Sequence, residues 1–295
     1  MAKAIFTTKI SPSYKDLPEL MYHFPKTYLR QANAAIGDWI VYYEPRREDS
    51  SPAGHAGRQC YFATARVTNV KEDPVLKDHY YAIIEDYTEF STPVPFKVGS
   101  NYFEMGLRKS DGSTNKGAFG RAVRNISDEE YQAIVSSGLG KIEQEIAHMV
   151  AEDNIEFNVQ RPLIQQLVER PFRDVVFSQI VKEEYNMTCA MTGISIKNDR
   201  GIGEIEAAHI KAVKFNGPDS VRNGIALCRT FHWMFDYGLV SVADNNEILA
   251  KDIVPDRVRE LINSDWLIRQ PVNHNAVPHP EFLKFHRNQH NFSSR

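Results

Sequence analysis

The sequence predicts an α+β protein with two folded parts joined by helices, and three observations predict it. Residues 1–125 hold several segments with the alternating apolar pattern of β-strands. Residues 126–170 have helical periodicity instead. From residue 206 onward the pattern is strand, turn, strand and helix. The chain has 295 residues, of which 42% are hydrophobic, so each part is able to bury a core of its own.

The first part is expected to be a small β-barrel. Strand candidates span residues 36–43, 61–70 and 80–87, and the Gly37-Asp38 turn opens the first of them. The polar segment over residues 44–58 is expected to be an exposed loop. Several short strands at this spacing favour a barrel over an α/β sheet.

The middle part is expected to be a helical connector. Ser127 stands three residues before Glu130, which is the capping-box pattern of a helix start. We expect interruptions at Gly138-Leu139-Gly140 and near Asn154, and a new helix over residues 172–185 that begins at Pro171. The predicted domains are therefore residues 1–125, 126–170 and 171–295.

Composition excludes some classes of protein. No run of apolar residues is long enough to span a membrane, and the N-terminus turns polar too early for a secretory signal. Three cysteines are too few for a disulfide framework, so a reducing bacterial cytoplasm is the expected compartment. The formal net charge of −3 means that any basic surface for nucleic acid is local.

The candidate catalytic residues lie between residues 206 and 236. One expected strand ends in His209, and the expected helix carries His232 and Asp236, one turn apart on the same face. Such a pair is able to hold a divalent cation from one side. Hydrolysis of a phosphodiester needs a base that takes a proton from water near neutral pH, and it needs a cation that offsets the developing negative charge. Asp236 has an alternative structural role, which is to accept hydrogen bonds within its own helix.

These residues strongly resemble the HNH (ββα-metal) endonuclease family. His209, Asn223 and His232 match the three motif positions, and residues 170–193 are similar to the segment that precedes the motif in bacterial HNH restriction nucleases. The resemblance covers about residues 165–245. It implies that His209 is the general base, that Asn223 braces the loop between the strands, and that His232 binds one Mg²⁺ or Mn²⁺ ion.

The sequence departs from the family at two places. Many members carry a metal ligand directly before the catalytic histidine, where this chain has Ala208. Glu206, on the same face of the strand, is the candidate replacement beside Asp236. Many relatives also bind a structural zinc with paired cysteines, whereas Cys189 and Cys228 each stand alone here. We therefore expect no structural zinc, and we expect the cysteines to be small buried residues.

Basic residues surround the motif. The candidates to contact the phosphates of DNA are Lys211, Lys214, Arg222 and Arg229. The alternative is that they are solvated surface charges.

The first part is rich in aromatic residues. The segments over residues 37–47 and 63–67 look most like an EVE-type domain of the PUA-like superfamily, over about residues 1–125. That resemblance implies recognition of 5-methylcytosine or 5-hydroxymethylcytosine by base flipping. The candidate pocket residues are Trp39, Tyr43, Tyr28, Phe24 and Asp86, with Arg46 and Arg47 on the DNA backbone. The alternative is that these aromatic residues belong to the barrel core.

The combined prediction is a modification-dependent restriction endonuclease acting on double-stranded DNA. One active site per chain implies a homodimer for cutting both strands. Two alternatives stay open: an HNH enzyme that reads an unmodified sequence, and a reader of modified nucleic acid that does not cleave.

Overall fold

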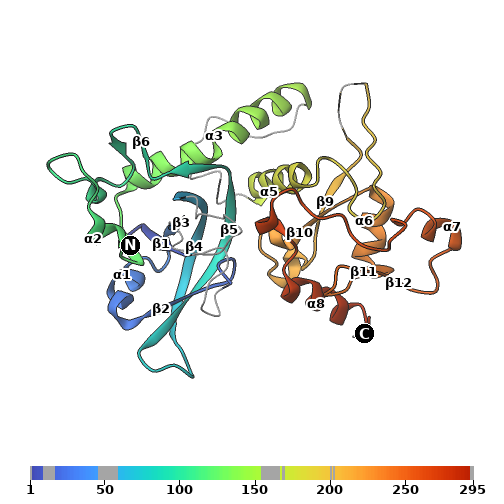
Figure 1. Cartoon of the computed structure of the whole chain (residues 1–295), viewed down its shortest axis with the longest axis horizontal. Coiled ribbons are helices and arrows are strands. Elements are labelled where there is room, and N and C mark those ends of the chain that lie inside the picture. Colours follow the sequence, from blue (N-terminus) through green and yellow to red (C-terminus); the bar gives the residue numbers. More distant parts are fainter. Residues whose placement is uncertain are drawn as a thin grey trace. The chain divides into compact units, whose positions relative to one another are not determined.

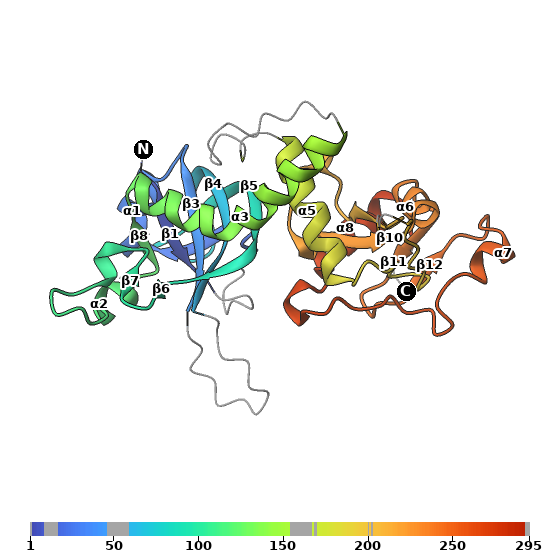
Figure 2. The ribbon, with the colours of Figure 1, turned by 90° about the horizontal axis from the view of Figure 1, so that it is seen from above.

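In the computed structural model the chain forms two compact units, residues 1–172 and residues 173–295 (Figures 1 and 2). The structure describes residues 2–8, 17–45, 59–153, 167, 170–199, 201 and 203–292, with the side chains of residues 141–153 left aside. Arg46, Arg47 and most of the expected loop over residues 44–58 lie outside the described residues. The three-part domain division stays a prediction.

The N-terminal unit is built on one curled sheet. Its strands are β1 (Ala4–Thr7), β2 (Met21–Pro25), β3 (Trp39–Glu44), β4 (Cys60–Glu72), β5 (His79–Pro95) and β8 (Val123–Asn125), beside a small hairpin of β6 (Lys97–Val98) and β7 (Asn101–Tyr102). The order in the sheet is β2-β5-β4-β3-β1-β8, with β1 parallel to β3 and antiparallel to β8. Among the described strands, β2 and β8 are free edges. The sheet is thus open, whereas we expected a closed barrel.

Short helices connect these strands. In this unit they are η1 (Lys26–Tyr28), α1 (Leu29–Ala34), η2 (Met105–Leu107) and α2 (Lys116–Phe119), followed by the long α3 (Asp128–Asp153). The concave side of the sheet holds a core in which Phe6, Tyr22, Phe24 and Tyr42 are buried, and α1 contributes Ala32 to it.

Helix α3 lies across the other face of the sheet, against β4 and β5 (Figure 2). The expected capping box is confirmed, because Ser127 N donates to Glu130 Oε2 at 2.8 Å and Glu130 N donates to Ser127 Oγ at 3.2 Å. The expected break at residues 138–140 is wrong, since α3 is continuous there. Any side chain at Gly138 would overlap the ring of Phe90, so this glycine permits close packing of the helix on β5.

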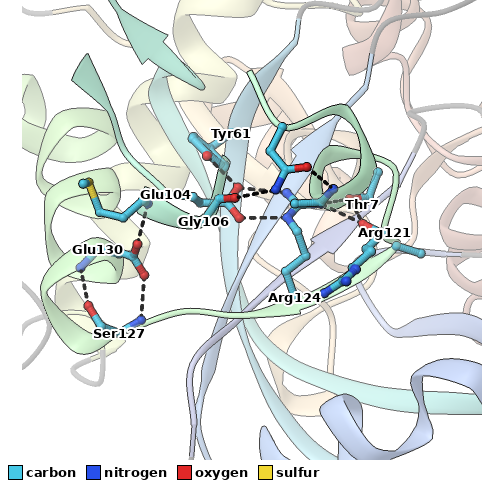
Figure 3. A network of polar contacts seen from close by, with 12 residues as sticks. Thr7, Tyr61, Glu104, Gly106, Arg121, Arg124, Ser127 and Glu130 are labelled. Carbon is cyan, nitrogen blue, oxygen red and sulfur yellow. Dashed lines mark hydrogen bonds and ion pairs between the residues drawn. The ribbon is translucent and has the colours of Figure 1, made fainter. Parts of the chain in front are cut away.

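A buried polar network ties the end of the sheet together (Figure 3). The guanidinium of Arg124 donates to both oxygens of Glu104 at 2.7 and 2.8 Å, and Tyr61 Oη donates to Glu104 Oε1 at 2.7 Å. Arg124 also reaches Thr7 Oγ1 at 3.0 Å. Because each charge is paired, the network joins β1, β4 and β8 without leaving a buried charge uncompensated.

The C-terminal unit is a mixture of short elements. It contains β9 (Glu206–His209), η3 (Val213–Phe215), η4 (Val221–Asn223), β10 (Gly224–Leu227), α6 (Arg229–Asp236), β11 (Val240–Val242), β12 (Ile248–Ala250), α7 (Asp256–Arg259), η5 (His274–Ala276) and α8 (Pro280–Gln289), after α5 (Arg170–Glu184). Helix α5 starts at the expected Pro171 within one residue. In the part of the chain that is described, no helix has the length and apolar character needed to cross a membrane.

The three cysteines are buried, as expected, but Cys189 and Cys228 do not stand alone, because their side chains share a hydrogen bond. Cys60, Cys189 and Cys228 are buried, and no disulfide joins any of them in the described part of the chain. Each fills interior space as a small hydrophobic residue.

Candidate active site

A β-hairpin and the helix after it position the motif residues. Strands β9 and β10 pair antiparallel, with His209 opposite Gly224 and Glu206 opposite Leu227. Gly224 leaves room for α5, because a Cβ at this position would run into Val181 and Phe177. Helix α6 begins directly after β10 and lies against β9, so the strand, turn, strand and helix follow in the expected order.

Asn223 holds the loop between the two strands. Its side chain is fully buried, and its amide donates to Lys211 O at 3.0 Å and to Pro218 O at 2.9 Å. Its carbonyl oxygen accepts from Lys211 N at 2.8 Å. Gly217 lies so near the Lys211 carbonyl that a Cβ would overlap it. The side chain of Asn223 thus fixes the path of the loop that leaves His209.

His209 belongs to a first group of contacts. Its Nε2 lies 3.0 Å from Asp219 Oδ1, and its ring stacks on Phe177 with centroids 3.8 Å apart and an interplanar angle of 15°. Asp219 Oδ2 in turn accepts from Arg173 Nε at 3.3 Å. The side chain of His209 is 17% exposed, so the ring is neither sealed in the core nor free in solvent.

His232 belongs to a second group. Its Nδ1 lies 2.8 Å from Glu206 Oε2, and its Nε2 lies 3.5 Å from Asp236 Oδ2, one helical turn further along α6. The other oxygen of Glu206 accepts from Arg229 Nε at 3.1 Å. Glu206 and Asp236 therefore both contact His232, and their role as metal ligands stays a prediction.

The two carboxylates do not converge on one point. Glu206 and Asp236 lie at different nitrogens of the same ring, and among the described residues no set of three or more acidic, histidine or cysteine side chains is arranged around one position for a metal. The two contact groups also lie at opposite ends of β9, where the Cα atoms of Glu206 and His209 are about 10 Å apart on the rise of an extended strand. We expected the base and the ligands side by side. That placement of the base beside the ligand side chains stays a prediction.

The basic residues near the motif have different neighbours. Arg229 forms an ion pair with Glu206. Lys211 Nζ lies 5.2 Å from the centre of the Phe285 ring, and Lys214 Nζ lies 5.1 Å from the centre of the Phe215 ring. Lys214 is exposed, and Lys211 and Arg222 are half-buried. Lys211, Lys214 and Arg222 therefore place three positive charges along the border of the loop after His209.

The expected base pocket is not brought together. Phe24 is in the concave core with Tyr28 packed against it, whereas Trp39 and Tyr43 point to the opposite face of β3. That face is covered: Thr64, which pairs with Val41, hydrogen-bonds Tyr131 of α3 at 2.7 Å.

Asp86 is also placed differently from our expectation. We put it at the end of its strand, but β5 continues to Pro95. Asp86 sits at a bulge with φ 52° and pairs with Arg66 at 2.9 Å.

Comparison with known families decides what the hairpin and helix are. Residues 189–243 match the family model described as HNH endonuclease. These residues form an HNH endonuclease domain. The match contains both strands of the hairpin, α6 and all three motif residues, His209, Asn223 and His232. No curated protein matches the chain.

Two solved structures are similar to the whole chain at a low level. One is titled "Modification dependent TagI restriction endonuclease", with 15% identity, 97% of this chain and 80% of that chain covered, and a TM-score of 0.31. The other is titled "Structure of the Type IV phosphorothioation-dependent restriction endonuclease ScoMcrA", with 11% identity, 98% and 53% covered, and a TM-score of 0.20. At these scores neither structure bears on the fold of the N-terminal unit.

Three residues that contact His209 or support its contacts were not among the site residues expected from the sequence. Arg173 and Phe177 come from α5, and Asp219 comes from the loop that Asn223 holds. The only signal for Asp219 was its place in the expected turn between the strands, and a turn aspartate ordinarily serves its own backbone.

Proposed function

We propose that this chain is a divalent-metal-dependent DNA endonuclease. The observation that carries the proposal is His209, which ends β9 inside the segment that matches the HNH endonuclease family and is partly accessible. Imidazole exchanges its proton near neutral pH, so His209 is suited to take a proton from the attacking water. In this proposal His209 is the general base.

A divalent cation would be held by His232 and Asp236. Their facing atoms, Nε2 and Oδ2, are 3.5 Å apart, near the roughly 3 Å between adjacent ligands that each lie about 2.1 Å from one ion. Glu206 would serve as the outer partner, because its carboxylate accepts from Nδ1–H and leaves the Nε2 lone pair for the ion.

The donor set suits several divalent ions. Imidazole nitrogen and carboxylate oxygen together are compatible with a range of metals, and we propose Mg²⁺ or Mn²⁺. When bound, the ion would act as a Lewis acid toward the phosphate and the leaving 3′ oxygen.

We propose that the loop after His209 supplies the residues that bind DNA. Lys211, Lys214 and Arg222 border this loop and would contact phosphates on either side of the cut. Because the net charge of the chain is −3, such local cations are needed for affinity. Cutting both strands with one site per chain would take two copies, so the proposal includes a homodimer on DNA.

The N-terminal unit is proposed to make cleavage depend on modified cytosine. It is a compact unit of its own, and its segments over residues 37–47 and 63–67 resemble EVE-type domains of the PUA-like superfamily. A reader of this kind would hold 5-methylcytosine or 5-hydroxymethylcytosine flipped from the duplex. The proposal does not depend on the five pocket residues expected from the sequence.

A cleavage assay tests both parts. Plasmids that differ only in carrying cytosine, 5-methylcytosine or 5-hydroxymethylcytosine are incubated with the protein and Mg²⁺ or Mn²⁺, with and without EDTA. We expect metal-dependent linearisation of modified plasmid only. His209→Ala should lower kcat by about 10²–10⁴-fold, the usual contribution of a general base.

The control and the adverse outcomes are distinct. His274→Ala removes an exposed histidine outside the HNH match and should cleave like the parent. Equal cutting of all three plasmids would indicate an HNH enzyme that reads unmodified sequence. Binding of modified DNA without cleavage in any metal would indicate a non-cleaving reader.

A further inference from the structure

One ring nitrogen of His209, Nε2, has Asp219 as its hydrogen-bond partner, and the other, Nδ1, points away from Asp219. Nε2 lies 3.0 Å from Asp219 Oδ1, and Phe177 covers one face of the ring in a nearly parallel stack. A stacked ring with one hydrogen-bonded nitrogen has little rotational freedom, because a small rotation about the Cβ–Cγ bond disturbs both contacts and a 180° flip loses the hydrogen bond. His209 is therefore held in one orientation.

Asp219 is itself firmly placed. Its side chain is only 3% exposed, and its second oxygen accepts from Arg173, whose side chain is 8% exposed. A buried carboxylate needs a nearby positive charge to remain ionised, and Arg173 supplies one. The backbone of the preceding residue is fixed as well, since Pro218 O accepts from Asn223 at 2.9 Å.

We propose that Asp219 is a positioning residue that sets the proton arrangement of His209, an inference that rests on the proposed nuclease function. An ionised carboxylate only accepts hydrogen bonds, so Nε2 carries the proton and Nδ1 carries the lone pair. Nδ1 is then the nitrogen that takes the proton from water. In that step a water O–H bond breaks, the hydroxide oxygen bonds to phosphorus, and the bond to the 3′ oxygen breaks, with solvent returning a proton to it.

The arrangement also favours the product of that step. Once Nδ1 has taken a proton, His209 is an imidazolium, and its Nε2–H still points at the Asp219 carboxylate. The attraction between the two charges stabilises the protonated ring in a low-dielectric place. Arg173 keeps the carboxylate from accepting the proton itself, because it donates to the other oxygen.

Asp219→Asn is the decisive substitution, because it keeps the shape and reverses the polarity. Arg173 only donates, so the oxygen of the introduced amide will face Arg173 and its NH₂ group will face Nε2. Nε2 must then accept, which moves the ring proton to Nδ1 and removes the lone pair from the nitrogen that needs it. We expect kcat to fall on the order of 10²–10⁴-fold with KM within about two-fold, as an orienting carboxylate beside a catalytic imidazole predicts.

Nitrogen NMR of ¹⁵N-histidine-labelled protein without metal shows which ring nitrogen of His209 carries the proton, and it does so independently of activity. The His209 signals are assigned by their loss in His209→Gln. In the unsubstituted protein we expect a protonated Nε2 and a bare Nδ1, and in Asp219→Asn the reverse. The measurement on the unsubstituted protein does not depend on the folding of Asp219→Asn; it needs only a folded His209→Gln variant for the assignment.

The matched control is Asp244→Asn. Asp244 pairs with buried Arg287 at 2.6 Å, so this change also removes a carboxylate from an arginine, but at a position outside the contacts of His209. It should leave kcat and the His209 signals unchanged.

The outcomes separate the two proposals. Cleavage by the unsubstituted protein, together with a His209 ring protonated on Nδ1 or with unchanged kcat in Asp219→Asn, overturns the role of Asp219 alone. Absence of cleavage by the unsubstituted protein under every metal condition overturns the nuclease function and the positioning role with it.

Discussion

Two neighbouring tyrosines in the N-terminal unit have hydroxyl groups in opposite situations. The rings of Tyr43 and Tyr61 are 5.3 Å apart and both side chains are fully buried. Tyr61 Oη donates to Glu104 at 2.7 Å, whereas Tyr43 Oη has no hydrogen-bond partner in the described part of the structure. Burial raises the pKa of both phenols, so both stay protonated. Only the Tyr61 hydroxyl stabilises the fold.

The same substitution at these two positions should therefore have opposite effects. Tyr61→Phe removes a hydrogen bond to a carboxylate and should lower the free energy of unfolding by about 1–3 kcal/mol. Tyr43→Phe removes an unsatisfied group and should leave the free energy unchanged or raise it by up to about 1 kcal/mol. Urea titrations followed by tyrosine and tryptophan fluorescence compare the two. A larger loss in Tyr43→Phe would contradict this account.

For single residues, the sequence predicts which side chains form the HNH motif better than it predicts what packs around a given side chain. His209, Asn223 and His232 identified the motif because the segment over residues 170–193 that precedes them also resembles HNH restriction nucleases, and residues 189–243 match the HNH endonuclease family. Strand alternation also put Trp39 and Tyr43 on one face, but it could not tell that α3 covers that face. What lies over a surface is a tertiary property, and no local pattern encodes it.

The loop between β9 and β10 is the element on which the HNH domain depends most. It leaves His209, carries Asp219 and returns to β10 through Asn223. A fully buried side-chain amide satisfies two carbonyl oxygens and one backbone N–H of this loop. This one side chain therefore joins the beginning of the loop, at Lys211, to its later part, at Pro218.

Asn223→Asp should disrupt that element. The carboxylate keeps the size of the amide but cannot donate, so it faces the carbonyl oxygens of Lys211 and Pro218 with like polarity. We expect a loss of roughly 2–4 kcal/mol in the free energy of unfolding of the C-terminal unit, as for a buried polar group without its partners. Asn288→Asp makes the same chemical change on the exposed side of α8 and should cost less than about 0.5 kcal/mol. Similar losses in both variants would show that the buried contacts are unimportant.

Elements were predictable where their signals are local. The strands over residues 61–70 and 80–87 and the helix that begins at Ser127 follow from periodicity and capping. The extension of β5 to Pro95 and its bulges depend on the partner strand β4, which sets the register. Gly138 was misread as a helix break because the packing of Phe90, not helix propensity, determines that position.

At the scale of the whole molecule, buried histidines make stability depend on pH. In the C-terminal unit His286 is 3% exposed, receives a hydrogen bond from Ser241 and donates Nε2–H to Phe235 O at 3.0 Å. Burial lowers its pKa to about 4, against an ordinary value of 6.5. The folded chain therefore holds His286 neutral at a pH where the unfolded chain binds a proton.

The sign of the effect follows from proton binding. Above about pH 6.5 both states are neutral at this residue and its contribution is complete; as the pH falls toward 4 the unfolded state binds the extra proton and stability is lost. We expect a loss of about 3 kcal/mol across this window from His286. His286→Gln should flatten the pH dependence of urea unfolding between about pH 7.5 and about pH 4.5, while His274→Ala should preserve it. An equally steep dependence in His286→Gln would rule out this origin.

The position of β1 inside the sheet determines when, during synthesis, the sheet of the N-terminal unit is able to complete its strand pairing. β1 leaves the ribosome before both of its neighbours, pairs with β3 on one side, and lacks its other neighbour until residues 123–125 emerge. During that interval the nascent chain presents a bare row of main-chain amides and carbonyls, which other growing chains are able to join. We therefore expect slower translation between β3 and β8 to lengthen this exposure and to increase the aggregation of newly made chains.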